Sequence, residues 1–162
     1  MVARDAGGKV TISEVNPNRI EIAHKLGFDT VNPAEQDLAQ TINEKTAGKG
    51  ADVVFEVSGT QKGVDAMTEI AATRARIVMV AIHAQKPQID LFQFFWRELQ
   101  LLGARVYEAA DYDKAIDIIT SGGVDADTII TDVSPLSDIQ ATFEALDSSP
   151  TAMKSLIRGG NE

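Results

Sequence analysis

The chain has 162 residues, 44% of them hydrophobic, and a formal net charge of −9 at pH 7. This length suits one domain or slightly more, and the apolar content excludes a disordered composition. The negative charge disfavours general nucleic-acid binding, because an acidic surface repels phosphate backbones. With no cysteine and only two histidines, the chain cannot build a thiolate zinc site, a disulfide or an iron–sulfur cluster.

Neither a membrane span nor a secretory signal is visible in the sequence. No apolar run reaches the ~18 residues that a membrane-spanning helix needs. Residues 1–8 lack the apolar stretch of a signal peptide. We therefore expect a cytoplasmic protein without membrane contact.

Strand-like and helix-like stretches alternate from the N-terminus onward. Residues 10–15 predict a strand, and Asn16-Pro17 then begins a helix. Asn is a favourable N-cap, and Pro is tolerated at the first helical position because no N–H is needed there. A short strand at residues 30–31 and a helix at 35–47 follow.

The middle of the chain continues this alternation. The β-branched, mostly apolar run at residues 52–57 predicts a strand that is covered on both faces. Thr60 caps a helix to about residue 72, strands are expected at 76–82 and 99–102, and Asp111 caps a helix to residue 121. Strands separated by helices of about 10–15 residues indicate βαβ units. The fold class is therefore α/β, a Rossmann-like doubly wound parallel sheet.

Both ends of the chain differ from this pattern. Towards the C-terminus we expect a short strand at residues 128–131, a helix that begins at Ser134-Pro135, and a closing strand at 154–157. Residues 1–6 followed by Gly7-Gly8 are typical of a last helical turn with its glycine stop, and a frayed terminus is the alternative. Because Gly7-Gly8 precedes a strand, it cannot serve as the G-x-G-x-x-G phosphate loop, which the sequence lacks.

Four residues at predicted strand ends mark the candidate site. They are Glu14, Ser58, Ala81 and Ala104. Ligands of open α/β sheets bind at the carboxyl ends of the strands, so we expect these residues to line one edge.

Glu14 and Arg19 are candidates for binding the adenosine ribose of a dinucleotide. An acidic residue at the end of the second strand accepts hydrogen bonds from the ribose hydroxyls and disfavours a 2′-phosphate, which favours NAD over NADP. The alternative for Glu14 is a solvated acid beside a helix N-terminus, which the helix dipole favours. For Arg19, a solvated surface side chain is the alternative.

The histidines and an aromatic cluster carry weaker indications. His24 is expected on a helix surface, and His83 is either a cofactor contact or a solvated loop residue. The cluster is better explained by core packing or a subunit interface than by base stacking, because its neighbours are not basic. Its members are Phe92, Phe94, Phe95 and Trp96.

In collinear order, several segments resemble the zinc-type medium-chain dehydrogenases, in the branch of the butanediol, sorbitol and threonine dehydrogenases. The matching stretches are 10–27 (VTISEVNPNRIEIAHKLG), 50–59 (GADVVFEVSG), 91–107 (LFQFFWRELQLLGARVY), 132–146 (DVSPLSDIQATFEAL) and 153–157 (MKSLI). The resemblance implies an oxidoreductase that transfers a hydride between NAD and a secondary alcohol. A catalytic zinc polarises the alcohol oxygen.

The resemblance also implies the cofactor contacts. Glu14 would be the ribose-binding acid and Arg19 the basic residue that accompanies it. The adenine side would be lined by Val57, Ser58 and Thr60, and the nicotinamide end by Val80, Ile82, Ala104 and Val106. Ala81 departs from the family, in which many relatives have glycine.

Other departures limit what the chain is expected to do. The family's zinc ligands lie in a catalytic domain without counterpart here, so we expect neither catalytic residues nor a metal site. Residues 1–126 would form a partial Rossmann domain that lacks its first strand, and residues 127–162 would return to the catalytic domain. We expect a truncated chain that is inactive alone and forms a homo-oligomer. A small non-catalytic protein that binds nucleotide or dimerises, or a remnant without ligand, are the alternatives.

Overall fold

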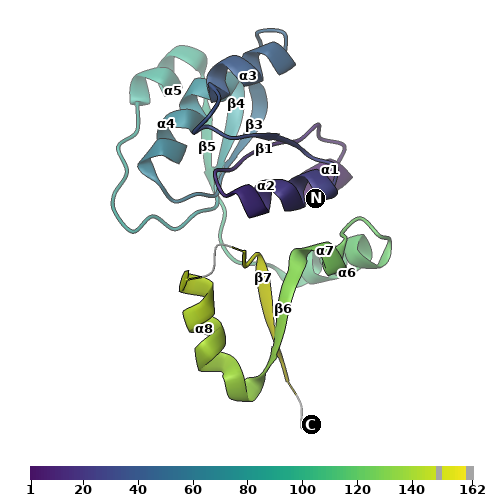
Figure 1. The fold of residues 1–162 in the computed structure, drawn as a ribbon. Helices are drawn as coiled ribbons and strands as arrows, with labels where there is room; N and C mark the ends of the chain where they lie inside the picture. The colour runs from purple at the N-terminus through teal and green to yellow at the C-terminus, as the bar shows by residue number, and fades with distance from the viewer. Residues whose placement is uncertain (149–150, 160–162) are drawn as a thin grey trace. The chain divides into compact units, whose positions relative to one another are not determined.

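The computed structural model describes residues 1–148 and 151–159, apart from the side chain of Asp147. The chain divides into two compact units: the first comprises residues 1–34 with 108–162, and the second comprises residues 35–107 (Figure 1). The described strands form three ladders, β1-β2, β3-β4-β5 and β6-β7, and all of them are parallel. The expected α/β class with parallel pairing is confirmed.

The N-terminal part of the first unit is a strand–helix–strand motif. Its elements are α1 (Val2–Asp5), β1 (Thr11–Ser13), α2 (Pro17–Lys25) and β2 (Asp29–Val31). As predicted, the Asn16 side chain caps α2 by accepting from the backbone N–H groups of Asn18 and Arg19. The helical turn expected at the N-terminus is also present, and Gly7 follows it at φ +85°.

The C-terminal part of the same unit contains α6 (Ala109–Thr120), α7 (Ala126–Ile129), β6 (Ile130–Pro135), a 3-10 turn η1 (Leu136–Asp138), α8 (Ile139–Ser148) and β7 (Lys154–Arg158). The closing strand is confirmed. Figure 1 shows α8 lying along the β6-β7 ladder, with which it shares contacts.

Three sequence-based boundaries in this segment are wrong. Asp111 does not precede α6 but lies in its first turn, where its carboxylate accepts from the N–H of Glu108 at 2.9 Å. The strand expected from residue 128 begins at Ile130, because the Asp125 carboxylate accepts from the N–H of Thr128 at 3.0 Å and closes a helical turn first. Pro135 is both the last residue of β6 and the N-cap of η1, so the helical segment expected from Ser134-Pro135 begins at Leu136.

The second unit contains α3 (Leu38–Lys45), β3 (Ala51–Glu56), α4 (Gln61–Ile70), β4 (Ala71–Met79), α5 (Leu91–Arg97) and β5 (Gln100–Gly103). The central strand is β4, which pairs with β3 and β5. Thr60 caps α4 as predicted, with its side chain accepting from the N–H of Gly63. Helix α3 begins later than expected, because Asp37 caps it through the N–H of Gln40.

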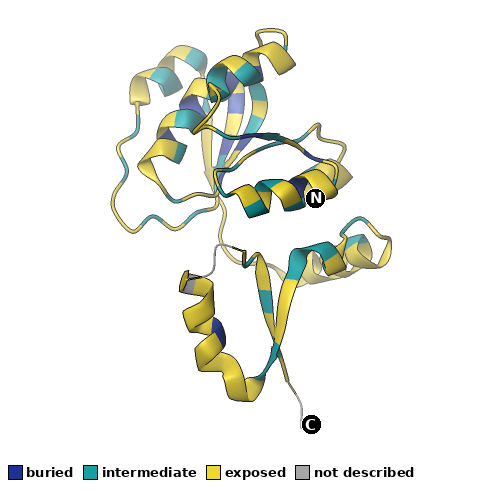
Figure 2. Cartoon of the chain, in the orientation of Figure 1, coloured by how far each residue is buried: buried dark blue, intermediate teal, exposed yellow. Residues whose placement is uncertain are grey.

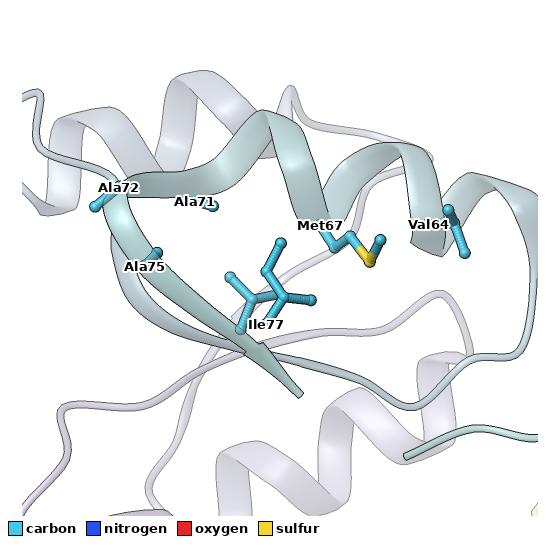
Figure 3. Packing of buried hydrophobic residues seen from close by; sticks show 7 residues of the cluster. Val64, Met67, Ala71, Ala72, Ala75 and Ile77 are labelled. Carbon is cyan, nitrogen blue, oxygen red and sulfur yellow. The ribbon is translucent and has the colours of Figure 1, made fainter. Parts of the chain in front are cut away.

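The core of the second unit lies between α4 and the sheet. Figure 3 shows Met67 and Val64 of α4 facing Ile77 of β4. These three side chains are almost fully buried, and Figure 2 shows buried residues gathered in the same elements. The cluster comprises Val54, Val64, Met67, Ala71, Ala72, Ala75 and Ile77.

Arg97, the last residue of α5, ties this helix to α4. Its guanidinium donates to the backbone carbonyl of Thr68, near the end of α4, and to that of Ala71 at 2.8 Å. A cation at the C-terminal end of a helix is favoured by the helix dipole. Arg97 therefore fixes α5 against the core.

The aromatic cluster of α5 divides between core and surface. Phe94 packs against the core, as expected. In contrast, Phe92, Phe95 and Trp96 are 60%, 78% and 69% exposed, and the rings of Phe92 and Trp96 stack at 6.0 Å. Core packing thus explains Phe94 and is wrong for the other three.

Candidate functional site

The carboxyl ends of β3, β4 and β5 are aligned in one edge of the second unit. Glu56 of β3 pairs with Met79 of β4, which pairs with Gly103 of β5. Beyond the last pairs, the N–H of Val80 donates to the Glu56 carbonyl at 2.9 Å and that of Ala104 to the Met79 carbonyl at 3.0 Å. Hydrogen bonding therefore continues in register past the ends of all three strands. Ser58, Ala81 and Ala104 follow these ends, as the sequence predicted.

Apolar side chains beside this edge are exposed. Val57 is 68% exposed, Val80 45%, Ile82 96% and Val106 72%. Exposed apolar residues that lie close together are typical of a surface that binds a ligand or another protein. All four belong to the predicted cofactor contacts, whose role stays a prediction.

Glu14 and Arg19 lie together in the first unit. Glu14 directly follows β1, and its Oε1 accepts from the N–H groups of Val15 at 2.8 Å and Asn16 at 2.9 Å. Its Oε2 lies 3.7 Å from Nη1 of Arg19. Two backbone N–H groups thus hold the Glu14 carboxylate beside the Arg19 guanidinium. In this arrangement Oε2 of Glu14 and the guanidinium can contact the same polar ligand. That Glu14 lines the same edge as Ser58, Ala81 and Ala104 of the other unit stays a prediction.

Glu56 is a residue that the sequence interpretation missed. It is only 3% exposed, and its Oε1 accepts from the N–H of Ser58 at 2.9 Å, the hydroxyl of Ser58 at 2.5 Å and the N–H of Gly59 at 3.2 Å. Buried carboxylates are rare unless they are hydrogen-bonded in this way. The signal in the sequence was an acid at the last position of an apolar strand.

His83 lies on the other side of the same carboxylate. Its Nε2 is 3.4 Å from Oε2 of Glu56, and its side chain is 11% exposed. This distance lies within the range of a salt bridge, but the two groups are not oriented for a hydrogen bond. Among residues 1–148 and 151–159, Nε2 of His83 has no hydrogen-bond partner. The solvated alternative for His83 is therefore wrong.

Two glycines make room for this cluster. Gly59 has φ +67°, and a Cβ there would lie 2.9 Å from the carbonyl oxygen of Ile82. At Gly63, in the first turn of α4, a Cβ would lie 2.1 Å from Oγ of Ser58 and 2.5 Å from Oε1 of Glu56. A side chain at either position would collide with the turns that follow β3 and β4.

The chain's donors do not suit a catalytic zinc, which needs roughly three protein ligands. Within the part of the chain that the structure describes, no three His, Cys, Asp or Glu residues group as metal ligands. His24 instead lies with Nε2 2.6 Å from Oγ1 of Thr30, and His83 faces Glu56. In the same described part, no helix is long and apolar enough to cross a membrane.

A shallow cavity of about 520 Å³ lies away from the strand ends, between α4 and α5. It is lined by Asp65, Thr68, Glu69, Asp90, Gln93 and Arg97. Its carboxylates would repel a pyrophosphate, and its one cation already binds the carbonyls of α4 and Ala71. The lining of this cavity therefore does not suit a dinucleotide.

Comparison with known proteins places these features in a family. Residues 1–121 match the family model described as zinc-binding dehydrogenase. The chain belongs to this family. Its members use NAD and zinc. The chain is 54% identical over 156 residues to 2-dehydro-3-deoxy-L-galactonate 5-dehydrogenase of Pseudoalteromonas atlantica, and 26% identical over 160 residues to sorbitol dehydrogenase of Halalkalibacterium halodurans.

A solved structure of the family has the same fold. The crystal structure of 2R,3R-butanediol dehydrogenase from Bacillus subtilis superposes with a TM-score of 0.89 at 26% identity, over 98% of this chain and 46% of that one. Both curated relatives are matched over 96% of this chain and 46% of their own length. The chain therefore spans about half the length of these dehydrogenases. The predicted resemblance and the Rossmann-like fold are confirmed.

Proposed function

We propose that this chain is the NAD(H)-binding part of a zinc-dependent alcohol or polyol dehydrogenase. One observation carries the proposal: the aligned carboxyl ends of β3, β4 and β5 form an edge with exposed apolar side chains and a glycine turn. Ligands of open parallel sheets bind at such an edge. Family membership supports the choice of NAD as the ligand.

Different residues of the proposed site would bind different parts of the cofactor. Glu14 would accept from the adenosine ribose hydroxyls, and Arg19 would face the same nucleoside. Val57, Ser58 and Thr60 would line the adenine side. Val80, Ile82, Ala104 and Val106 would pack against the nicotinamide end. When bound, NAD supplies the carbon that accepts the hydride, and these side chains orient it and exclude water.

The substrate is proposed at the level of chemical class. The relative that is 54% identical is named for a dehydrogenation of a sugar acid, and others are named sorbitol dehydrogenase and xylulose reductase. A protein that joins this chain to a catalytic domain would thus oxidise a secondary alcohol of a polyol or sugar acid. Residues 127–162 would contact that domain. We further propose a cytoplasmic homo-oligomer.

A second candidate is a small protein that binds nucleotide or dimerises without catalysis. The edge formed by the carboxyl ends of β3, β4 and β5 would serve such a protein as well as a dehydrogenase. Fusion of the catalytic half of a 2-dehydro-3-deoxy-L-galactonate 5-dehydrogenase to this chain separates the two candidates. Turnover by the fusion supports the dehydrogenase, and binding without turnover supports the second candidate.

Calorimetric titration of the purified chain with NAD and NADP tests the cofactor. We expect weak binding that favours NAD, because the Glu14 carboxylate repels a 2′-phosphate and the chain has no glycine loop to hold the pyrophosphate. Glu14→Ala should abolish the preference. Glu21→Ala, on the exposed side of α2, should leave it unchanged. Tight NADP binding that Glu14→Ala does not alter would contradict the assignment.

A further inference from the structure

Two turns follow β3 and β4 at the edge described above. The first turn comprises residues 57–60 and the second turn residues 80–83. Under the proposed function they contact opposite ends of the dinucleotide. A ligand that spans both turns binds well only if their separation is fixed.

Glu56 is hydrogen-bonded to both turns. Its side chain accepts from the N–H groups of Ser58 and Gly59 in the first turn. Its backbone carbonyl accepts from the N–H groups of Val80 at 2.9 Å and Ala81 at 3.1 Å in the second. A single buried residue thus connects the two segments.

Further contacts hold the turns around this carboxylate. Oε2 of Glu56 lies 3.4 Å from Nε2 of His83, at the far end of the second turn. The backbone of Gly59 approaches the carbonyl of Ile82 so closely that no Cβ fits between them. The hydroxyl of Ser58, which donates to Glu56, also lies 3.0 Å from that of Thr60. The two turns and the carboxylate therefore form one packed cluster.

We propose that Glu56 is a positioning residue that sets the separation of the two turns for the dinucleotide. It is buried at 3% exposure, so it acts through the turns and not by touching the ligand. This inference rests on the proposed function, since the ligand that spans the turns is NAD(H). It predicts that loss of the carboxylate harms a ligand that reaches both turns more than one that reaches only the first.

The test compares NADH with ADP-ribose, which lacks the nicotinamide ring. Both ligands are titrated calorimetrically into the purified chain and into its Glu56→Ala and Glu56→Gln variants. For Glu56→Ala we expect NADH to bind about tenfold more weakly and ADP-ribose less than about threefold, because the freed N–H groups of Ser58 and Gly59 loosen the first turn relative to the second. Glu56→Gln keeps an accepting oxygen and should recover most of the NADH affinity. Glu69→Ala, an exposed acid of α4, is the matched control and should change neither.

Hydrogen exchange of the ligand-free protein gives an independent measurement. The amides of Ser58 and Gly59 should exchange faster in Glu56→Ala, while those of the core strands stay protected. If Glu56→Ala does not fold, Glu56→Asp replaces it. Its carboxylate is one methylene too short to reach both the amides of Ser58 and Gly59 and the ring of His83, while its backbone carbonyl still binds the second turn, so the same selective loss is expected.

Each outcome decides between the proposals. Equal losses for NADH and ADP-ribose, or no loss of either, would overturn the positioning role while leaving NAD binding in place. If the unmodified chain binds neither ligand, the proposed function fails and the positioning role fails with it.

Discussion

Arg74 and Glu98, 24 residues apart, form an ion pair in which both partners have a left-handed backbone. Nε of Arg74 lies 2.7 Å from Oε2 of Glu98, and the φ angles are +63° and +52°. The hydrogen bond from Arg74 and its positive charge hold the pKa of Glu98 below its usual value. The same hydrogen bond and the negative charge of Glu98 raise the pKa of Arg74. The pair therefore links the early part of β4 to the residue that follows α5.

Glu98→Gln should reduce the pH dependence of stability. Because the pKa of Glu98 is lowered in the folded state, the pair stabilises the protein above the unfolded pKa of this carboxyl and ceases to do so as the pH falls through the folded pKa. Urea midpoints of the variant and the unmodified protein should thus differ at neutral pH and converge in acid. Both side chains are exposed, so the difference should be small and should shrink with salt. Arg74→Met should behave alike, and a pH-independent difference would count against this assignment.

Gly63→Ala should destabilise the protein by about 1–3 kcal/mol, because overpacking forces a buried cluster to shift. The added Cβ would lie 2.1 Å from Oγ of Ser58. Gly103→Ala is the matched control: it meets no atom within 4 Å and should stay within about 0.5 kcal/mol. Equal free energies of unfolding for the two variants, measured in urea, would show that the residues around Glu56 and Ser58 accommodate the added Cβ without strain.

Ile77→Ala should cost about 2–5 kcal/mol, the usual range for a large-to-small change in a packed core. Ile77 is 0% exposed and lies in the central strand of the β3-β4-β5 ladder. Ile82→Ala removes the same atoms at a residue that is 96% exposed, and it should change the free energy of unfolding by no more than about 0.5 kcal/mol. Thermal or urea unfolding measures both, and similar losses would mean that Ile82 is covered in solution.

A polypeptide of these 162 residues should not oxidise alcohols. Hydride transfer in this family needs zinc to polarise the alcohol oxygen, and the chain has no cysteine and two histidines, His24 and His83, that lie in different units. Without a glycine loop to hold the pyrophosphate, the nicotinamide is also poorly oriented. NADH formation is measured with butanediol, sorbitol and threonine in the presence of zinc. Turnover above a control without protein would refute this prediction, and fusion to a catalytic domain should restore activity.

Local sequence determined much of this protein. The strand–helix alternation predicted the α/β class, and the caps at Asn16 and Thr60 were readable because a cap depends on residues two or three positions away. The family resemblance also rested on sequence, since each matching segment is a continuous stretch of the chain and the segments occur in collinear order. The division of the chain at residue 126 and the cofactor roles of Glu14, Arg19 and the strand-end residues stay predictions.

Only the tertiary structure revealed what holds the candidate site together. Glu56 is an acid in an apolar strand until folding brings its carboxylate to the amides of Ser58 and Gly59 and to the ring of His83. Arg97 was not singled out in the sequence, and in the fold its guanidinium donates to the carbonyl of Ala71. The contacts of Glu56 with Ser58 and Gly59 are local, but its burial and its contact with His83 follow no local pattern, and neither does the role of Arg97. Each role depends on the burial of a charged group beside hydrogen-bonding partners that a turn or a distant segment brings to it. Only packing determines which polar groups are removed from water and therefore need such partners.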